Sequence, residues 1–228
     1  MTGDANDGWA RAVRSRLGLG RLLPLGGAAD GSWIAEKAAA AVLMRAAENV
    51  PGLVLHQVRL APADPEFHAE PLVPSPPGAL PPGPLRIEAE AAGLAGADSI
   101  PAAAERLRGV LVPFCADRIG LLVTGMDVRV TGLLEAVPYR PRPVAPDRGT
   151  TAVRGPAAEA AAAVPGVASL TGVLGAPVHT AAGHVRVEIA VAAGHRALSV
   201  ALAVRAAVAG AAQGESSVGV LVTTVELP

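Results

Sequence analysis

Two alanine-rich segments of the chain have the composition of helices and stop at the same kind of step. Residues 34–53 run through alanines and other apolar residues to Val-Pro-Gly-Leu, and residues 155–167 end in Val-Pro-Gly-Val. Alanine has the highest helix propensity, and a Pro-Gly pair does not continue a helix. The pattern therefore predicts one helix over each segment, with the two stops at Pro51-Gly52 and Pro165-Gly166.

Each of these helices is followed by residues that are typical of strands. Stretches typical of strands run over 53–60 and 167–174. Further along, residues 85–91 alternate between apolar and charged or small positions, and residues 185–191 start in the same way. In the alternating stretches, Arg86-Ile87-Glu88 matches Arg186-Val187-Glu188. A period of two places the charges on one face of a strand, so both stretches predict a sheet with one buried face.

A glycine, a helix and a closing strand complete each half. Gly93 and Gly194 end the alternating stretches, and helical spacing of apolar residues follows over 100–114 and 198–208. The order helix–strand–strand–helix–strand therefore occurs twice. It predicts an α+β fold of two tandem modules, each a small sheet with helices on one face. The closing strands are expected at 126–131 and 218–225.

Proline-rich segments define the expected domain boundaries. Nine prolines between residues 62 and 84 exclude regular structure there, so we expect an extended insert between the two central strands of the first module. A second segment rich in proline and arginine is expected to link the modules. The predicted organisation is a basic N-terminal arm over 1–31, a first module over 32–137 with its insert at 62–84, a linker over 138–148 and a second module over 149–228.

Composition narrows the class of protein. The formal net charge is −1, so the basic footprint of a general nucleic-acid binder is missing. Aromatic residues make up only 2% of the chain, so the core must consist of Val, Leu and Ala. A single cysteine excludes an internal disulfide framework. No apolar run approaches the roughly 20 residues that cross a bilayer, and no signal peptide is evident. We expect a cytoplasmic protein. Peripheral attachment at the inner face of the membrane is a second possible location.

Few residues suggest chemistry. Cys115 lies on the apolar stripe of a helix with no base nearby in sequence, which favours a buried structural thiol. His179 and His184 could approach each other across a turn, but no His is paired with Cys, Asp or Glu at metal-ligand spacing. We therefore expect surface histidines, no metal site, no cofactor and no enzymatic activity. The five histidines are His56, His68, His179, His184 and His195.

Two further patterns have competing interpretations. Glu88 and Glu90 lie on one face of a strand, where two carboxylates could do acid–base work. Arg86 shares that face, and we interpret all three as its solvated, charge-compensated surface. The segment Gly93-Leu-Ala-Gly96 matches a GxxG loop of KH nucleic-acid-binding modules, but it follows a strand and lacks basic residues. A KH-like module is kept as a second alternative function.

Two segments are candidate contact surfaces. In the N-terminal arm, Trp9, Val13 and Leu17 are spaced by four, as on one face of a short basic amphipathic helix, which is typical of contact with an anionic membrane or a partner. Extended proline-rich segments are suited to docking in partner grooves. The remaining candidate contacts are Arg11, Arg14, Arg16 and Arg21 in the arm, and Pro74, Pro76, Pro77, Pro81 and Pro82 in the insert.

Most of the chain, roughly 32–135 and 152–228, resembles the alkaline-shock-protein family of bacterial envelope-stress proteins. The resemblance covers the Val-x-Gly-Val step, the alternating strand that ends in glycine, the amphipathic helix and the Val-x-Val-x-Val closing strand. The proline-rich insert departs from the pattern of the family. Ala92 and Ala193 also depart from it, because the family has an aromatic residue at these positions. The positions that carry the resemblance are 50–53, 87–93 and 128–130 in the first half, and 164–167, 187–194 and 218–222 in the second.

The resemblance implies a divergent double-domain relative that acts as a non-enzymatic, envelope-associated scaffold or adaptor. Its expected partners are proteins, one of which could be membrane-anchored, and self-association is expected because the second half is sparsely charged. No nucleic acid is expected as a partner. A pair of regulatory domains that binds a small ligand in a pocket between the two modules is the first alternative.

Overall fold

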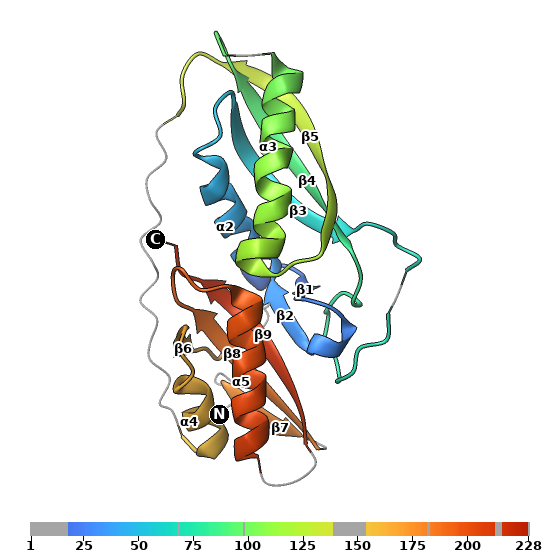
Figure 1. The fold of residues 1–228 in the computed structure, drawn as a ribbon, viewed down its shortest axis with the longest axis vertical. Coiled ribbons are helices and arrows are strands. Elements are labelled where there is room, and N and C mark those ends of the chain that lie inside the picture. The colour runs from blue at the N-terminus through green and yellow to red at the C-terminus, as the bar shows by residue number, and fades with distance from the viewer. Residues whose placement is uncertain are drawn as a thin grey trace, which may run out of the picture.

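The computed structural model describes residues 18–138, except 68 and 98, and residues 154–227, except 182 and 213–215. In this part of the chain, four α-helices pack on two mixed β-sheets, of three and six strands (Figure 1). The α+β class expected from the sequence is confirmed.

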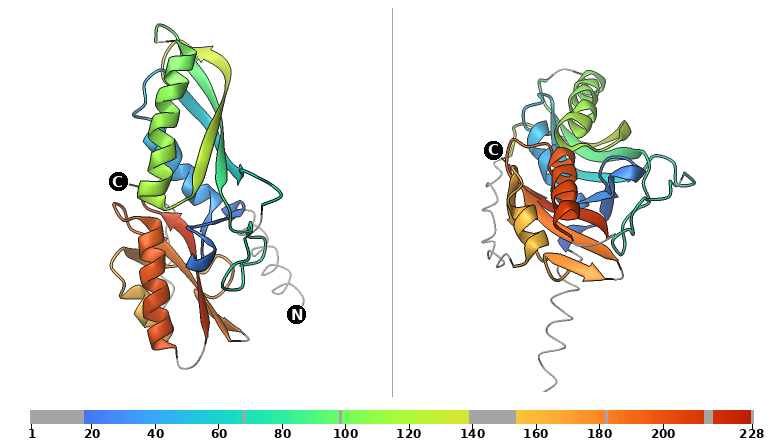
Figure 2. Two further views of the ribbon diagram at one scale, coloured as in Figure 1. Left: turned by 45° about the vertical axis from the view of Figure 1, so that its right-hand side comes forward. Right: turned by 60° about the horizontal axis from the view of Figure 1, so that its bottom comes forward.

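The three-stranded sheet occupies one end of the molecule, and its strand order is β3-β4-β5. The central strand β4 pairs antiparallel with β3 and parallel with β5. Two helices, α2 and α3, pack on one face of it, and none of the helices in the described residues covers the opposite face (Figure 2). The bounds are β3 Leu53–Pro62, β4 Leu85–Leu94, β5 Val123–Leu134, α2 Glu36–Ala47 and α3 Ile100–Phe114.

The six-stranded sheet has the order β1-β2-β9-β8-β6, and β7 also pairs with β8. Strand β9 lies between two parallel neighbours, β8 and β2. Helices α4 and α5 pack against each other and against β6 and β9. The bounds are β1 Leu22–Pro24, β2 Ser32–Ala35, β6 Val167–Leu170, β7 Val178–Ala181, β8 His184–Val191, β9 Ser217–Val225, α4 Pro156–Ala162 and α5 Ala197–Ala211.

The N-terminal region differs from the prediction. Residues 22–35, expected to belong partly to an arm and partly to the first helix, form β1 and β2 of the six-stranded sheet, and α2 begins only at Glu36. The reason is a long-range pairing: Trp33 and Ile34 lie opposite Leu221 and Val222 of β9. The pattern of apolar residues around position 34 is local and cannot predict pairing with a strand about 190 residues later in the chain.

The second half also departs from the expected strands. The strand predicted over 167–174 ends at Leu170, and the chain then loops over 171–177 before β7, which the sequence pattern did not predict. Two glycines and Pro177 interrupt the ladder in this loop. The backbone amides of Val173 and Leu174 bind the Glu188 carboxylate instead of a neighbouring strand.

The proline-rich segment connects β3 to β4 and folds back on the N-terminal strands. The Leu72 amide donates to the Ala28 carbonyl (3.0 Å), and the Leu80 amide donates to the Leu22 carbonyl (2.8 Å). The segment is therefore anchored at two points rather than extended freely into solvent. Of the five prolines predicted to dock a partner, Pro76 and Pro82 are buried, whereas Pro74, Pro77 and Pro81 are exposed.

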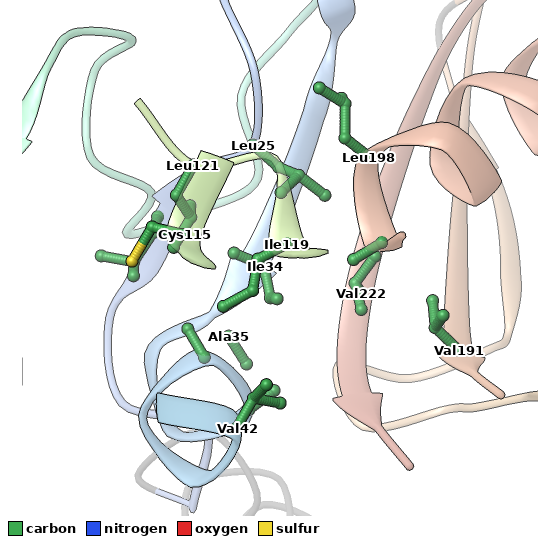
Figure 3. Packing of buried hydrophobic residues seen from close by; sticks show 14 of the residues in the cluster. Leu25, Ile34, Ala35, Val42, Cys115, Ile119, Leu121, Val191, Leu198 and Val222 are labelled. Carbon is green, nitrogen blue, oxygen red and sulfur yellow. The ribbon is translucent and has the colours of Figure 1, made fainter. Parts of the chain in front are cut away.

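The two halves share one continuous hydrophobic core. After α3, a turn of π-helix over Cys115–Ile119 leads to Gly120, which has a φ of 97°. A Cβ on Gly120 would lie 2.3 Å from the Leu198 side chain of α5, so only glycine permits this approach. Figure 3 places Leu198 beside this segment, with Ile34 of β2 near it as well. Strand β2 is thus part of the joint between the halves.

Candidate functional site

The helix-free face of the three-stranded sheet presents two rows of polar side chains. The register aligns Arg59, Glu88 and Asp127 across the three strands, and it aligns Gln57, Glu90 and Arg129 in the neighbouring row. The intervening residues point to the opposite face and form the core, because side chains alternate along a strand. The two rows line an open hollow of about 440 Å³.

Asp127, one of the carboxylates in this hollow, is paired with an arginine beside it. Arg86 forms a two-point ion pair with Asp127 of the adjacent strand, and the Nη2–Oδ1 distance is 2.6 Å. The hydrogen bond from Arg86 lowers the pKa of the Asp127 carboxyl. Arg86 also interacts electrostatically with Glu88 of its own strand, as the prediction of charge compensation expects. Its direct partner is nevertheless Asp127, because the parallel register brings that carboxylate within its reach. Glu88 is exposed and Glu90 is partly exposed, which confirms the solvated face.

The hollow has the chemistry of a binding surface. Three carboxylates and two guanidinium groups line it, and such groups form charge-assisted hydrogen bonds with polar or charged ligands. No residue lining the hollow is a histidine, cysteine or serine that could act as a nucleophile or a base of neutral pKa. The mixture of signs does not form the basic stripe that nucleic-acid binding requires.

The corresponding face of the six-stranded sheet is covered. Arg186 and Glu188 occupy β8, and the Glu188 side chain is completely buried. Its Oε2 accepts hydrogen bonds from the amides of Val173 (2.7 Å) and Leu174 (3.1 Å), and its Oε1 lies 3.3 Å from Arg186 Nη2. Burial raises the pKa of Glu188, although these partners act in the opposite direction. The loop 171–177 thus lies over the charged row.

An indole and an imidazole complete this covered face. Rings of Trp33 and His184 lie over Gly219, where an added Cβ would be 3.5 and 3.1 Å from their nearest atoms. His184 Nδ1 is 2.8 Å from the Ser217 hydroxyl, and burial, with the charge of Arg186, lowers the pKa of His184. For two buried donors here, Trp33 Nε1 and Arg186 Nε, the described residues provide no hydrogen-bond partner.

Neither the role of Trp33 in the core nor the burial of Glu188 was predicted from the sequence. A tryptophan in a chain with 2% aromatic residues was a usable signal for Trp33, since an indole of this size is a strong candidate for the core. No local signal distinguishes Glu188 from Glu88, because both occupy the same Arg-x-Glu pattern. Glu188 is buried because the loop 171–177 covers it, and its backbone amides bind the carboxylate.

The structure places the other candidate residues apart from the hollow. Cys115 is fully buried, which confirms the prediction, and burial raises the pKa of its thiol to about 12. His179 lies opposite Arg186, and His184 lies opposite Ala181, in the same hairpin. Within the described residues, no group of three His, Cys, Asp or Glu side chains could hold a metal ion. His56 and His195 are exposed, and His68 lies outside the described residues.

The hypothesis of a basic N-terminal arm requires Arg21 to be free to contact a membrane or partner. In the structure, Arg21 is held within the fold. Its guanidinium binds both carboxylate oxygens of Glu36 at 3.0 and 3.2 Å, and Glu36 Oε1 also accepts from the Leu60 amide at 3.1 Å. Burial acts to raise the pKa of Glu36, but these hydrogen bonds outweigh it and the net pKa is lowered. Arg21 therefore fixes the start of α2 against β3. The other arm candidates, Trp9, Arg11, Val13, Arg14, Arg16 and Leu17, lie outside the described residues.

Comparison with known proteins adds no relative. No family model, curated protein or solved structure matches the chain. The resemblance to the alkaline-shock-protein family therefore stays a prediction from the residues that carry it. None of the helices in the described part of the chain has the length and apolar character needed to cross a membrane.

Proposed function

We propose that the chain is a tandem pair of related modules. The strongest support is the matching topology. Strand β4 pairs antiparallel with β3 and parallel with β5, and β8 pairs antiparallel with β6 and β7 and parallel with β9. Arg86 lies opposite Gly125, as Arg186 lies opposite Gly219. The helices that join the parallel strands, α3 and α5, are both 15 residues long. Equivalent positions can therefore be compared between the halves.

We further propose that the protein is a non-enzymatic scaffold or adaptor, and that the hollow on β3-β4-β5 binds an extended segment of a partner protein. One observation carries this proposal. The equivalent face of the second module is occupied by a segment of the chain itself, whose amides bind Glu188. In the first module, the equivalent Glu88 is exposed in an open hollow.

The chemistry of the hollow favours a polypeptide occupant. Carboxylates accept backbone N–H groups well, as Glu188 does in the covered module. Arg59 and Arg129 flank the acidic residues and add donors for carbonyl or carboxylate groups of the same segment. Interactions of this kind give register and specificity more than affinity, since exposed ion pairs contribute only about 0–1 kcal/mol each.

Cross-linking in cells tests the binding surface. A photoreactive residue introduced at Gln57, inside the hollow, is expected to form an adduct with a protein other than this chain. The double variant E88K/E90K should abolish the adduct, because it reverses the charges that hold the segment. Mass spectrometry of the adduct, followed by titration of the purified partner with both forms, measures the effect.

A matched control separates this surface from general exposure. The same photoreactive residue at Glu159, which is exposed on α4 of the second module, should not form that adduct. An adduct at Gln57 that persists unchanged in E88K/E90K, or that also forms from Glu159, would show that the hollow is not the binding surface.

We also propose that the scaffold acts at the cell envelope, as the family resemblance implies, through the basic residues of its N-terminal region. Deleting residues 2–17 should release the protein from the membrane fraction of native cells, with the full chain sedimenting in a salt-sensitive manner. The deletion must stop before Arg21 and β1, because these residues belong to the fold. If the full chain stays in the supernatant at low salt, the envelope proposal is wrong.

A further inference from the structure

The outer edge of β5 is the longest unpaired strand edge in the described part of the chain. Strand β5 spans 12 residues and pairs on one side with β4, and no described strand pairs with its other side. It contains neither lysine nor proline, the residues with which proteins commonly protect such edges. We infer that β5 pairs antiparallel with β5 of a second copy of this chain.

The second module supplies an internal precedent, which rests on the proposed equivalence of the two halves. Strand β9 corresponds to β5, and its outer edge is not free: β2 pairs with it over Val220–Val222. The Val220 amide donates across this edge to the Gly31 carbonyl at 3.1 Å. The register of the two modules makes Met126 the counterpart of Val220, so Met126 marks the edge that has no strand beside it.

An arginine on each joining helix reports the same difference. Arg108 and Arg205 both occupy the ninth position of their 15-residue helices. Arg205 donates to the Ala29 carbonyl at 2.7 Å, in the segment that leads into β2 beside β9. Arg108 instead donates to the Met126 carbonyl of β5 itself at 2.9 Å. The arginine that holds residues 28–30 beside β9 in one module thus binds a carbonyl of β5 in the other.

The sequence of β5 is complementary to itself in the antiparallel direction. A two-fold axis at Val128 places this residue opposite its own copy, Asp127 opposite Arg129 of the second copy, and Met126 opposite Val130. Directly opposed residues share a face of the sheet, so opposite charges meet on the helix-free side and apolar side chains meet on the core side. This match favours a second copy of the chain over an unrelated strand.

Such pairing would join two three-stranded sheets into one of six strands. Both hollows would lie on the same face of the joined sheet, because a two-fold axis perpendicular to the sheet keeps equivalent faces together. A dimer would therefore present two copies of the binding surface side by side. Dimerisation itself does not require the hollow to bind anything, so the two proposals can fail independently.

Sedimentation equilibrium of the full chain and its charge variants tests the pairing. The wild-type chain is expected to form a dimer, and both D127R and R129D should weaken self-association about tenfold or more, because each places like charges opposite each other twice. An equimolar mixture of D127R and R129D should recover a dimer close to wild-type affinity. In that mixed dimer, two arginines face two aspartates.

The variant R59D is the matched control, since Arg59 is exposed on the same face but lies two strands away from the β5 edge. It should dimerise like the wild-type chain, and circular dichroism should confirm that all variants are folded. A monomeric wild-type chain overturns the inference. So does a dimer that R129D leaves unchanged, or a mixture of the two variants that stays monomeric.

Discussion

Replacing Glu188 with alanine is expected to lower the free energy of unfolding by about 3–5 kcal/mol. The side chain is completely buried, and its carboxylate accepts the amides of Val173 and Leu174 and faces Arg186. Removing it leaves two partly buried amides and a largely buried guanidinium without this acceptor. Urea denaturation followed by circular dichroism measures the loss, and the covering loop 171–177 should become accessible to protease.

Glu88 provides the control for this prediction, because it occupies the equivalent position of the other module in an exposed setting. Glu88→Ala should change the free energy of unfolding by less than about 0.5 kcal/mol. Equal losses from the two substitutions would mean that the loop does not bury Glu188 as described.

The same residue should give the protein a distinctive pH dependence. Burial raises the pKa of Glu188 in the folded state above its ordinary value of 4.5. Between that value and the folded pKa, the folded chain binds more protons than the unfolded chain, so this residue's contribution to stability falls as pH rises through the window. Compared with Glu188→Gln, the wild-type chain should therefore lose stability as pH rises above 4.5. A flat difference between the two would contradict the raised pKa.

Trp33→Ala is the second substitution with a large expected effect, a loss of about 3–5 kcal/mol in the free energy of unfolding. Trp33 belongs to β2, the strand that joins the N-terminal region to β9, and its indole is 1% exposed. The ring lies beside Gly219 of β9. Its removal leaves a cavity on the covered face of the six-stranded sheet, beside Gly219 and His184. Thermal and urea denaturation followed by circular dichroism check the magnitude, since the chain's second tryptophan complicates fluorescence.

Trp33→Phe separates the packing of the ring from its N–H group. Because Trp33 Nε1 finds no hydrogen-bond partner in the described part of the chain, phenylalanine removes a buried donor without a partner there while it keeps an aromatic ring in place. The loss should be much smaller than for alanine. If both substitutions cost the same, the N–H group has a partner that stabilises the fold.

Elements defined by local pattern were predictable from the sequence. The helices α3 and α5 and the strand β4 follow from apolar spacing and alternation that a window of about ten to fifteen residues contains. Strand β2 could not be predicted in this way, because Ser32–Ala35 is only four residues long and its partner is β9. The pattern that continues from Ile34 into α2 masked the boundary at Glu36.

The candidate site was predictable only in part. Alternation placed Glu88 and Glu90 on a solvated strand face, and the register that aligns Asp127 and Arg129 with them completes the hollow. That register depends on the length and packing of α3, which connects the two parallel strands. The covered face around Glu188 required knowledge of where the loop 171–177 folds, and its glycines and proline indicate a break without indicating its path.

The pairing of β2 with β9 also constrains the order in which the protein can assemble. Ser32–Ala35 leaves the ribosome long before Ser217–Val225, its neighbour in the sheet. The strands β3, β4 and β5 are complete much earlier and contain mostly local connections, so the first module can collapse during synthesis. Strand β2 can pair early with β1, where Trp33 lies opposite Pro24, but its other edge must wait until β9 is made. Closing so long a loop is slow. Docking of β9 is therefore expected to be the late step of folding, during which the nascent chain is most open to misassociation.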